Sequence, residues 1–342
     1  MSAAPPSAAA SERPDPTALV RLSTAYWDSQ TLLTANRLRV FDVLADGARA
    51  PDEIAAALGL DPRATGIFLR ACVGLGLLQE VGGRIANSPS AAAFLVSRSP
   101  AYLGGAMRYS DQLYGTWGQL EQALRSGRPA MAAETYLGDD PEKTRTFVQS
   151  MHGRALGIAR ALVEILDLSG RRNLLDVGGG PGTYSILLTG RFPGLHSEVL
   201  ELPGVAAVAR EIVAAAGASG RVTLRDGDYH EADFGSGRDA VLMSGMFHRE
   251  TPHTCRQLIE RAWHCLAPGG LLAVSDVFTD EGGTRPAFAT MFGLNMMLTA
   301  PDGSVHADAD VRRWMSDCGF VELSTTPLPP PMPHRVVTGM KP

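Results

Sequence analysis

A glycine-rich turn constrains the fold of this chain more than any other feature. Residues 176–182 read DVGGGPG, and they follow the apolar run of residues 173–175. Residues 183–188 continue the chain with the apolar spacing of a helix. The order strand, glycine turn, helix is typical of the ligand-binding turn of an open α/β sheet. Glycine suits such a turn because the backbone adopts positive φ there and a ligand can approach without meeting a Cβ atom.

Strands and helices alternate after residue 172. The predicted strands are 173–177, 198–202, 222–225, 240–244, 271–276, 321–325 and 336–340, with helices after the first, second, fourth and fifth. This alternation predicts a mainly parallel sheet that is covered on both faces. Residues 327–333 leave no room for a crossover helix, so the last two strands are predicted to be antiparallel.

The amino-terminal part has a different pattern. Residues 1–16 are rich in Ala, Pro and Ser and predict a disordered tail. Residues 17–105 contain helical patterns closed by a hairpin about Gly82-Gly83, which predicts a winged helix. Residues 106–168 are predicted to be connecting helices, and residues 169–342 form the sheet domain. The would-be recognition helix carries only Arg63 and Arg70, so a packing or dimerisation module is favoured over a DNA-binding regulator.

Charge and cysteine usage exclude several classes of protein. The 342 residues have a net charge of −5, which disfavours binding to nucleic acid or an anionic membrane. The four cysteines are scattered and form no C-x-x-C pair, so neither a zinc site nor a disulfide framework is indicated. No secretory signal or run of about 18 apolar residues is present. These features predict a cytoplasmic protein with reduced thiols.

Polar side chains gather where the predicted strands end. Asp176, Glu201, Asp228 and His248 each follow or end a strand, and parallel strands bring their carboxyl ends to one edge of a sheet. Glu201 is placed to accept both hydroxyls of a ribose. A dinucleotide fingerprint would require glycine at the position of Thr183, so an adenosyl ligand of another kind fits better.

The ordered set of motifs resembles a known family. Residues 174–182, 201–203, 227–229, 247–248 and 268–270, with the segments 294–298 and 318–320, are similar to the S-adenosylmethionine-dependent O-methyltransferases of the caffeate and acetylserotonin type. The resemblance covers nearly the whole chain from about residue 18. It implies a Rossmann-like class I methyltransferase domain with a seven-stranded sheet, preceded by a winged-helix dimerisation domain. It also implies a homodimer, with S-adenosylmethionine as cofactor and a small aromatic acceptor.

The resemblance assigns roles to individual residues. On the cofactor side it places the methionine end at Asp176, Gly178 and Gly180, the ribose at Glu201, the adenine at Leu202, Asp228 and Tyr229, and the cofactor carboxylate near Ser244. On the acceptor side it places Phe147, Met151, Asn295 and Met296. His248 matches the catalytic base, and Asp276 matches the acid that orients it. A phenol is only about one thousandth ionised at neutral pH, so a neutral histidine would assist attack by the phenolic oxygen.

The chain also departs from the family pattern beside the base. His248 is followed by Arg249-Glu250 where the family has Asp-Trp, and Val305 stands where it has a second acid. C- or N-methylation and a non-methylating, cofactor-bound relative therefore stay open as alternatives. A metal site built on His248, His253 and His306 is disfavoured, because residues five apart do not share a helix face. The favoured hypothesis is methylation of a phenolic hydroxyl.

Overall fold

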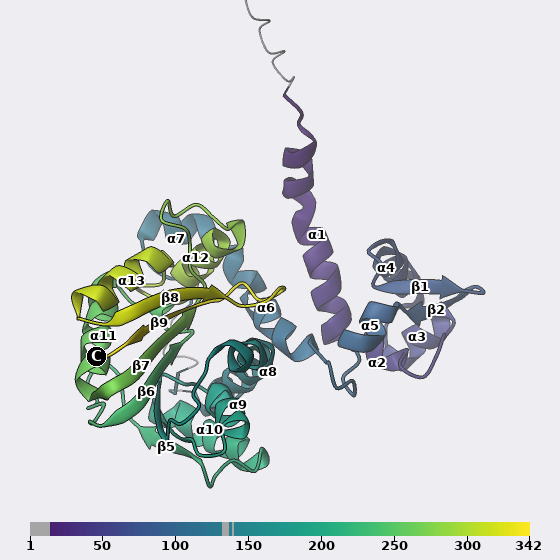
Figure 1. Ribbon diagram of the computed structural model, residues 1–342. Coiled ribbons are helices and arrows are strands. Elements are labelled where there is room, and N and C mark those ends of the chain that lie inside the picture. The colour runs from purple at the N-terminus through teal and green to yellow at the C-terminus, as the bar shows by residue number, and fades with distance from the viewer. Residues whose placement is uncertain (1–13, 132–136, 139) are drawn as a thin grey trace, which may run out of the picture. The chain divides into compact units, whose positions relative to one another are not determined.

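The computed structural model describes residues 14–131, 137–138 and 140–342. They form two compact units, one ending at Gly104 and the other beginning at Gly105 (Figure 1). Of the predicted tail, residues 1–13 lie outside the described residues. Among the described helices, none combines the length and apolar character needed to cross a membrane.

The first unit is a helical domain closed by a hairpin. Its elements are α1 (Thr17–Arg37), α2 (Val40–Val43), α3 (Pro51–Leu58), α4 (Pro62–Gly74), β1 (Leu78–Val81), β2 (Arg84–Asn87) and α5 (Pro89–Phe94). Strands β1 and β2 pair antiparallel, as the hairpin prediction requires. Helix α4 begins where Asp61 Oδ1 accepts a hydrogen bond of 2.7 Å from the Ala64 amide, which satisfies one of the free N–H groups of the first turn.

The second unit begins with helices and continues as an α/β domain. Helices α6 (Gly104–Trp117), α7 (Leu120–Ser126) and α8 (Pro141–Ile165) come first. The alternating part then runs β3 (Asn173–Val177), α9 (Thr183–Arg191), β4 (His196–Glu201), α10 (Pro203–Ala215), β5 (Val222–Asp226), β6 (Arg238–Ser244), η2 (Phe247–Arg249), α11 (Pro252–Cys265), β7 (Leu266–Asp276), α12 (Ala287–Thr299), α13 (Asp308–Asp317), β8 (Val321–Pro327) and β9 (Arg335–Met340).

The sheet of this unit has seven strands in the order β5-β4-β3-β6-β7-β9-β8. Strands β5, β4, β3, β6 and β7 pair in parallel, whereas β9 runs antiparallel to both β7 and β8. The predicted fold class is therefore confirmed, including the antiparallel last pair.

Both faces of the sheet are buried. Successive side chains along each strand point to opposite faces and so enter two different cores. Leu175 and Val177 of β3 join a core with α11 and α13, and Leu174 of the same strand joins a core with α8 and α9. Figure 1 shows these two helical layers on opposite sides of the strands. The chain order β3-α9-β4 brings the ends of β3 and β4 to the same edge, where the candidate site lies.

Candidate active site

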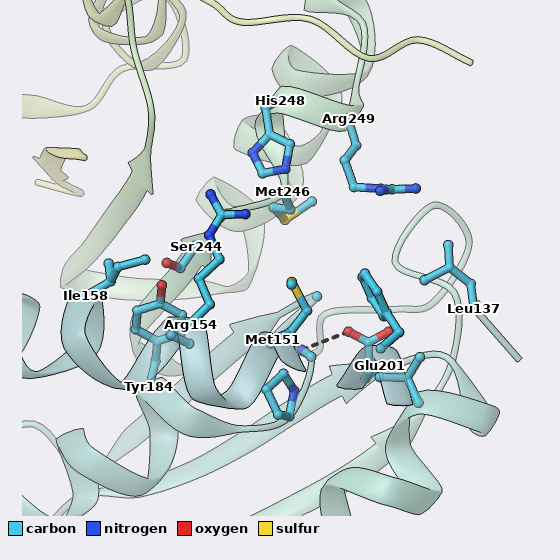
Figure 2. A pocket seen from close by; sticks show the side chains of 18 of the residues that line it. Leu137, Met151, Arg154, Ile158, Tyr184, Glu201, Ser244, Met246, His248 and Arg249 are labelled. Carbon is cyan, nitrogen blue, oxygen red and sulfur yellow. Dashed lines mark hydrogen bonds between the residues drawn. The ribbon is translucent and has the colours of Figure 1, made fainter. Parts of the chain in front are cut away.

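A cavity opens at the carboxyl edge of the central strands and lies wholly within the second unit. Its floor is the glycine turn after β3, and its walls come from α6, α8, α12, the segment after β6 and the loop before β9. Figure 2 shows Glu201 on one side of this cavity and His248 on the other, with Met151 between them. Residues from distant parts of the sequence therefore face one another across a single space.

The glycine turn presents bare backbone to the cavity. Gly178, Gly180 and Gly182 have φ of 63°, 55° and 73°, a region that favours glycine. A Cβ atom added to Gly179 would lie 2.7 Å from Asp176 Cγ, whereas one added to Gly180 meets nothing within 4 Å. Close packing thus fixes one side of the turn, and the open side of Gly180 lines the cavity. A side chain at position 180 would occupy the space that a ligand needs.

Glu201 ends β4 with its carboxylate fixed by backbone amides. Its Oε2 accepts a 2.9 Å hydrogen bond from Gly180 N, and its Oε1 accepts a 2.8 Å hydrogen bond from Leu202 N. The first of these bonds ties the end of β4 to the glycine turn of β3. Burial raises the pKa of Glu201, and the two amides and the charge of Arg249 oppose that rise. Glu201 and Leu202 both line the cavity, so free acceptor positions remain for a diol.

Asp176 lies beneath the turn rather than in the cavity. Its side chain is fully buried, and Oδ2 accepts a 2.6 Å hydrogen bond from the Ser185 hydroxyl. Burial raises the pKa of Asp176 to about 7 against that hydrogen bond. The sequence predicted Asp176 to hold the methionine end of a cofactor; in the structure its carboxylate packs beneath Gly179, and its Oδ1 has no hydrogen-bond partner among the described residues.

Asp228 and Tyr229 belong to a network of polar contacts at the rim. The Tyr229 hydroxyl donates a 2.5 Å hydrogen bond to Glu250 Oε1. His230 bridges two acids, with Nδ1 2.7 Å from Asp228 Oδ1 and Nε2 3.1 Å from Glu250 Oε2. Burial lowers the pKa of His230, but the two carboxylates outweigh it and raise that pKa overall. Tyr229 lines the cavity, whereas Asp228 is exposed and holds His230 instead.

This network gives a structural role to one departure from the family pattern. Glu250 is a buried acid that fixes the ring of Tyr229 from its hydroxyl end. A second departure, the His306 that follows Val305, is also buried, and its Nε2 lies 3.0 Å from the carbonyl oxygens of both Phe247 and Glu250. His306 therefore holds in place the segment that carries His248, through contacts with its backbone carbonyls.

His248 and the buried Asp276 form a pair across the ends of β6 and β7. His248 Nδ1 lies 2.7 Å from Asp276 Oδ1, and the His248 backbone amide donates to Asp276 Oδ2 at 3.2 Å. Burial raises the pKa of Asp276, but the His248 ring, its hydrogen bond and His334 outweigh this and hold the pKa below its ordinary value. An ionised Asp276 can only accept hydrogen bonds, so Nδ1 donates to it, and in the neutral ring the lone pair lies on Nε2.

The acceptor side of the cavity is apolar. Phe147 and Met151 on α8 and Met296 on α12, which the sequence predicted as acceptor contacts, line the cavity. The Phe292 ring lies edge-on to His248, with ring centroids 4.9 Å apart. Asn295 does not line the cavity: its Oδ1 accepts a 2.9 Å hydrogen bond from Trp117 Nε1, and its amide reaches the Tyr109 hydroxyl at 3.4 Å. Asn295 therefore supports the wall from behind.

Several lining residues were missed by the sequence interpretation. They include Arg154 on α8, Tyr184 on α9, Arg249 on η2 and His334 before β9. Arg154 follows Met151 by three residues and so shares its face of the helix, a spacing that could have identified it. His334 lies in a proline-rich connection without periodicity, and no comparable signal exists for it.

The histidines considered for a metal site are not brought together. The described residues contain no group of three or more His, Cys, Asp or Glu side chains with the geometry to hold a metal ion. His306 is instead occupied with backbone carbonyls, and His248 is paired with Asp276.

The residues present fit S-adenosylmethionine, the cofactor that the resemblance implies. The open side of Gly180 forms a cradle that a Cβ atom would fill, and Glu201 offers a fixed carboxylate to a ribose. The Ser244 hydroxyl is buried beside Tyr184, at the place expected for the cofactor carboxylate. Tyr229 lies against Gly178 and closes the adenosyl side.

Comparison with known proteins agrees with this geometry. Residues 117–321 match the O-methyltransferase domain model, and residues 20–97 match the O-methyltransferase dimerisation domain model. The chain is 32% identical over 330 residues to 3-hydroxy-5-methyl-1-naphthoate 3-O-methyltransferase of Streptomyces sahachiroi, covering 95% of both chains. It is 32% identical over 310 residues to the N,N-dimethyltransferase OxyT of Streptomyces rimosus, covering 88% of this chain and 90% of the relative.

A solved structure shows the same fold. Human N-acetylserotonin methyltransferase, in complex with S-adenosylmethionine, superposes with a TM-score of 0.85 at 23% identity and covers 97% of this chain and 99% of the human chain. Together with the family models, which span the dimerisation domain and most of the α/β unit, these matches establish the assignment. The chain belongs to the O-methyltransferase family, whose methyl donor is S-adenosylmethionine.

Proposed function

We propose that this enzyme transfers the methyl group to a phenolic hydroxyl of a small aromatic acceptor, with His248 as the general base. The observation that carries the proposal is the His248–Asp276 pair, in which Nδ1 faces the carboxylate and Nε2 is left for an acceptor in the cavity. When bound, S-adenosylmethionine supplies a methyl group that its sulfonium already activates. The chain then has to align the acceptor oxygen and remove its proton.

The pair is suited to that proton transfer. A phenol has a pKa near 10, so about one thousandth of it is ionised near pH 7. His248 Nε2 takes the proton as the oxygen attacks, and the charge that forms on the ring is stabilised by Asp276 at 2.7 Å. Asp276 also keeps the ring in the tautomer that has its lone pair at Nε2. A positioned base of this kind typically contributes about 10²–10⁴-fold in rate.

The walls favour a flat, apolar acceptor. Met151 and Met296 carry flexible thioethers that pack well against aromatic faces. Phe147 adds an aromatic side chain, and its ring centroid lies 6.5 Å from that of Tyr109. The name of the Streptomyces sahachiroi relative specifies O-methylation of a hydroxynaphthoate, which supports an aromatic hydroxyl acceptor and a role in secondary metabolism.

An N-methyltransferase is the second candidate, because the relative OxyT is named an N,N-dimethyltransferase. An amine attacks through its neutral nitrogen, which needs no base before bond formation. The same cavity could align such an acceptor without using His248. The role of the base therefore separates the two functions.

We also propose that the enzyme acts as a homodimer. Helix α1 exposes large apolar side chains within the dimerisation domain: Leu19 is 70% exposed, Leu22 72% and Trp27 59%. Large apolar side chains gathered on one exposed helix are typical of a protein interface. Light scattering on the purified chain is expected to give twice the mass of one chain.

A screen of acceptors tests the proposed function. Calorimetry with S-adenosylhomocysteine is expected to show binding in the micromolar range or tighter. Phenols, naphthols and aromatic amines are then incubated with S-adenosylmethionine, and products are analysed by mass spectrometry. O-methylation is supported if a phenol gains the mass of a methyl group and its methyl ether, incubated in the same way, does not. Absence of binding, or methylation of amines alone, contradicts it.

A further inference from the structure

The acceptor side of the cavity contains a positive charge without a carboxylate partner. Arg154 lines the cavity from α8 and is half-buried. Its guanidinium carbon lies 5.2 Å from the centroid of Tyr109 and 5.5 Å from that of Phe292. Within the described part of the chain, Arg154 makes no ion pair and no hydrogen bond, so these ring contacts are what hold it. A cation in this position keeps its hydrogen-bonding capacity for a ligand.

The contacts of Arg154 with two aromatic rings place it in the acceptor half of the cavity. Tyr109 belongs to α6 and Phe292 to α12, and neither element contributes to the glycine turn. Phe292 also packs edge-on against His248. Figure 2 shows the guanidinium reaching upward from α8, past Ser244, in the direction of His248. The charge is therefore close to the proposed base and away from Glu201.

A second polar group on the cavity also lacks a partner. His334 is 6% exposed, and its Nδ1 has no hydrogen-bond partner in the described structure, although the residue lines the same cavity. Burial lowers the pKa of His334 to about 4, and the charge of Arg154 contributes to that lowering. His334 is thus neutral near pH 7, close to Arg154, and able to donate one hydrogen bond to a ligand.

We propose that Arg154 and His334 form a receptor for a carboxylate carried by the methyl acceptor, so that the acceptors are hydroxylated aromatic acids. The planar guanidinium matches the two oxygens of a carboxylate, and a half-buried site strengthens the pairing. The aromatic ring of the acceptor then lies among Phe147, Met151 and Met296, with its hydroxyl toward His248 Nε2. This inference rests on the proposed function and specifies its substrate class.

The carboxylate of the cofactor is the other anion that could reach Arg154. Ser244 is already the expected partner for that group, and its hydroxyl is buried beside Tyr184 at the end of β6. The two sources are distinguished by measuring the binding of each ligand separately. Arg249 offers a matched control, since it is a second arginine on the same cavity, whose charge acts on Glu201 at the cofactor end.

Calorimetry on the full chain tests the proposal. The protein is saturated with S-adenosylhomocysteine and titrated with hydroxybenzoates and hydroxynaphthoates, each compared with its carboxamide. We expect at least one of these carboxylates to bind about 10–100-fold more tightly than the corresponding carboxamide. This ratio of dissociation constants corresponds to the free energy of a hydrogen bond to a charged group. Arg154→Gln is expected to abolish this preference, Arg154→Lys to retain part of it, and Arg249→Gln to leave it unchanged.

The outcomes separate this proposal from the proposed function. If no carboxylate binds more tightly than its carboxamide, or if Arg154→Gln keeps the preference, the receptor is excluded. If Arg154→Gln weakens binding of S-adenosylhomocysteine by about tenfold or more, the guanidinium serves the cofactor, and the proposal is overturned. Unchanged binding of S-adenosylhomocysteine also shows that the variant is folded. Failure of the wild-type chain to methylate any bound phenol would instead contradict the proposed function.

Discussion

The two halves of the cavity are held in place by different kinds of interaction. The cofactor half consists of the glycine turn and the end of β4, which are joined by backbone hydrogen bonds such as that from Gly180 N to Glu201. The acceptor half consists of side chains from α6, α8, η2, α12 and the segment before β9. Backbone geometry defines the first half, and side-chain identity defines the second.

The charges of the two halves differ as well. The cofactor half contains the buried acids Asp176 and Glu201, whose pKa values are raised by burial. The acceptor half contains the His248–Asp276 pair and the guanidinium of Arg154. An acid suits a ribose, whereas a base and a cation suit an acidic acceptor. Substitutions in each half are therefore expected to affect one ligand and spare the other.

The largest effect is expected for His248→Ala. Removal of the base should lower kcat about 10²–10⁴-fold for a phenolic acceptor. The affinity for S-adenosylhomocysteine should be unchanged, because His248 lies across the cavity from Glu201 (Figure 2). Single-turnover kinetics and calorimetry measure the two quantities. Unchanged turnover would mean that alignment alone drives transfer, as for an amine acceptor.

A smaller effect is expected for Asp276→Asn, which removes the charge behind the base but keeps its shape. Loss of a hydrogen bond to a charged group costs about 1.5–3 kcal/mol, which corresponds to about 10–100-fold in kcat. A variant with normal kcat would remove Asp276 from the mechanism.

The converse test is Glu201→Gln in the cofactor half. The amide keeps one acceptor oxygen but loses the charge and faces a backbone N–H with its own NH₂ group. We expect affinity for S-adenosylhomocysteine to fall about tenfold, in line with one charge-assisted hydrogen bond. The ratio of turnover between phenols should stay the same at saturating cofactor. A change in acceptor preference would show that the two halves are coupled.

The fold and the cofactor half could be predicted from the sequence because their signals are local. Glycines at 178–182 specify a turn, and Glu201 ends a strand that must lie beside it in a parallel sheet. The limits of this reasoning appear at Asp176 and Asn295. Both residues belong to motifs of the family, but neither lines the cavity. A motif does not reveal whether a side chain faces a cavity or packs behind its wall.

The acceptor half could be predicted only in part, because its residues meet through tertiary packing. Arg154 shares a helix face with Met151, but its cavity neighbours Tyr109, Phe292 and His334 are far from it in sequence. The role of Glu250 depends on its contact with Tyr229, 21 residues away. No periodic pattern reports contacts of this kind.

The smallest effect is expected at the rim of the cofactor half, where His230 bridges Asp228 and Glu250. The folded state raises the pKa of His230, so its stabilising effect is complete below the unfolded value of about 6.5 and is lost as pH rises through the higher folded value. His230→Gln should therefore destabilise the chain more near pH 5.5 than near pH 8.

The difference should be modest, because the His230 side chain is 46% exposed and solvent screens its ion pairs. We expect at most about 0.5 kcal/mol in the free energy of unfolding, measured by urea denaturation of both proteins at both pH values. Tyr229→Phe is the matched control, since it removes the neutral partner of Glu250 and should destabilise equally at the two pH values. Equal destabilisation by His230→Gln at both pH values would mean that the ring acts by packing rather than by charge.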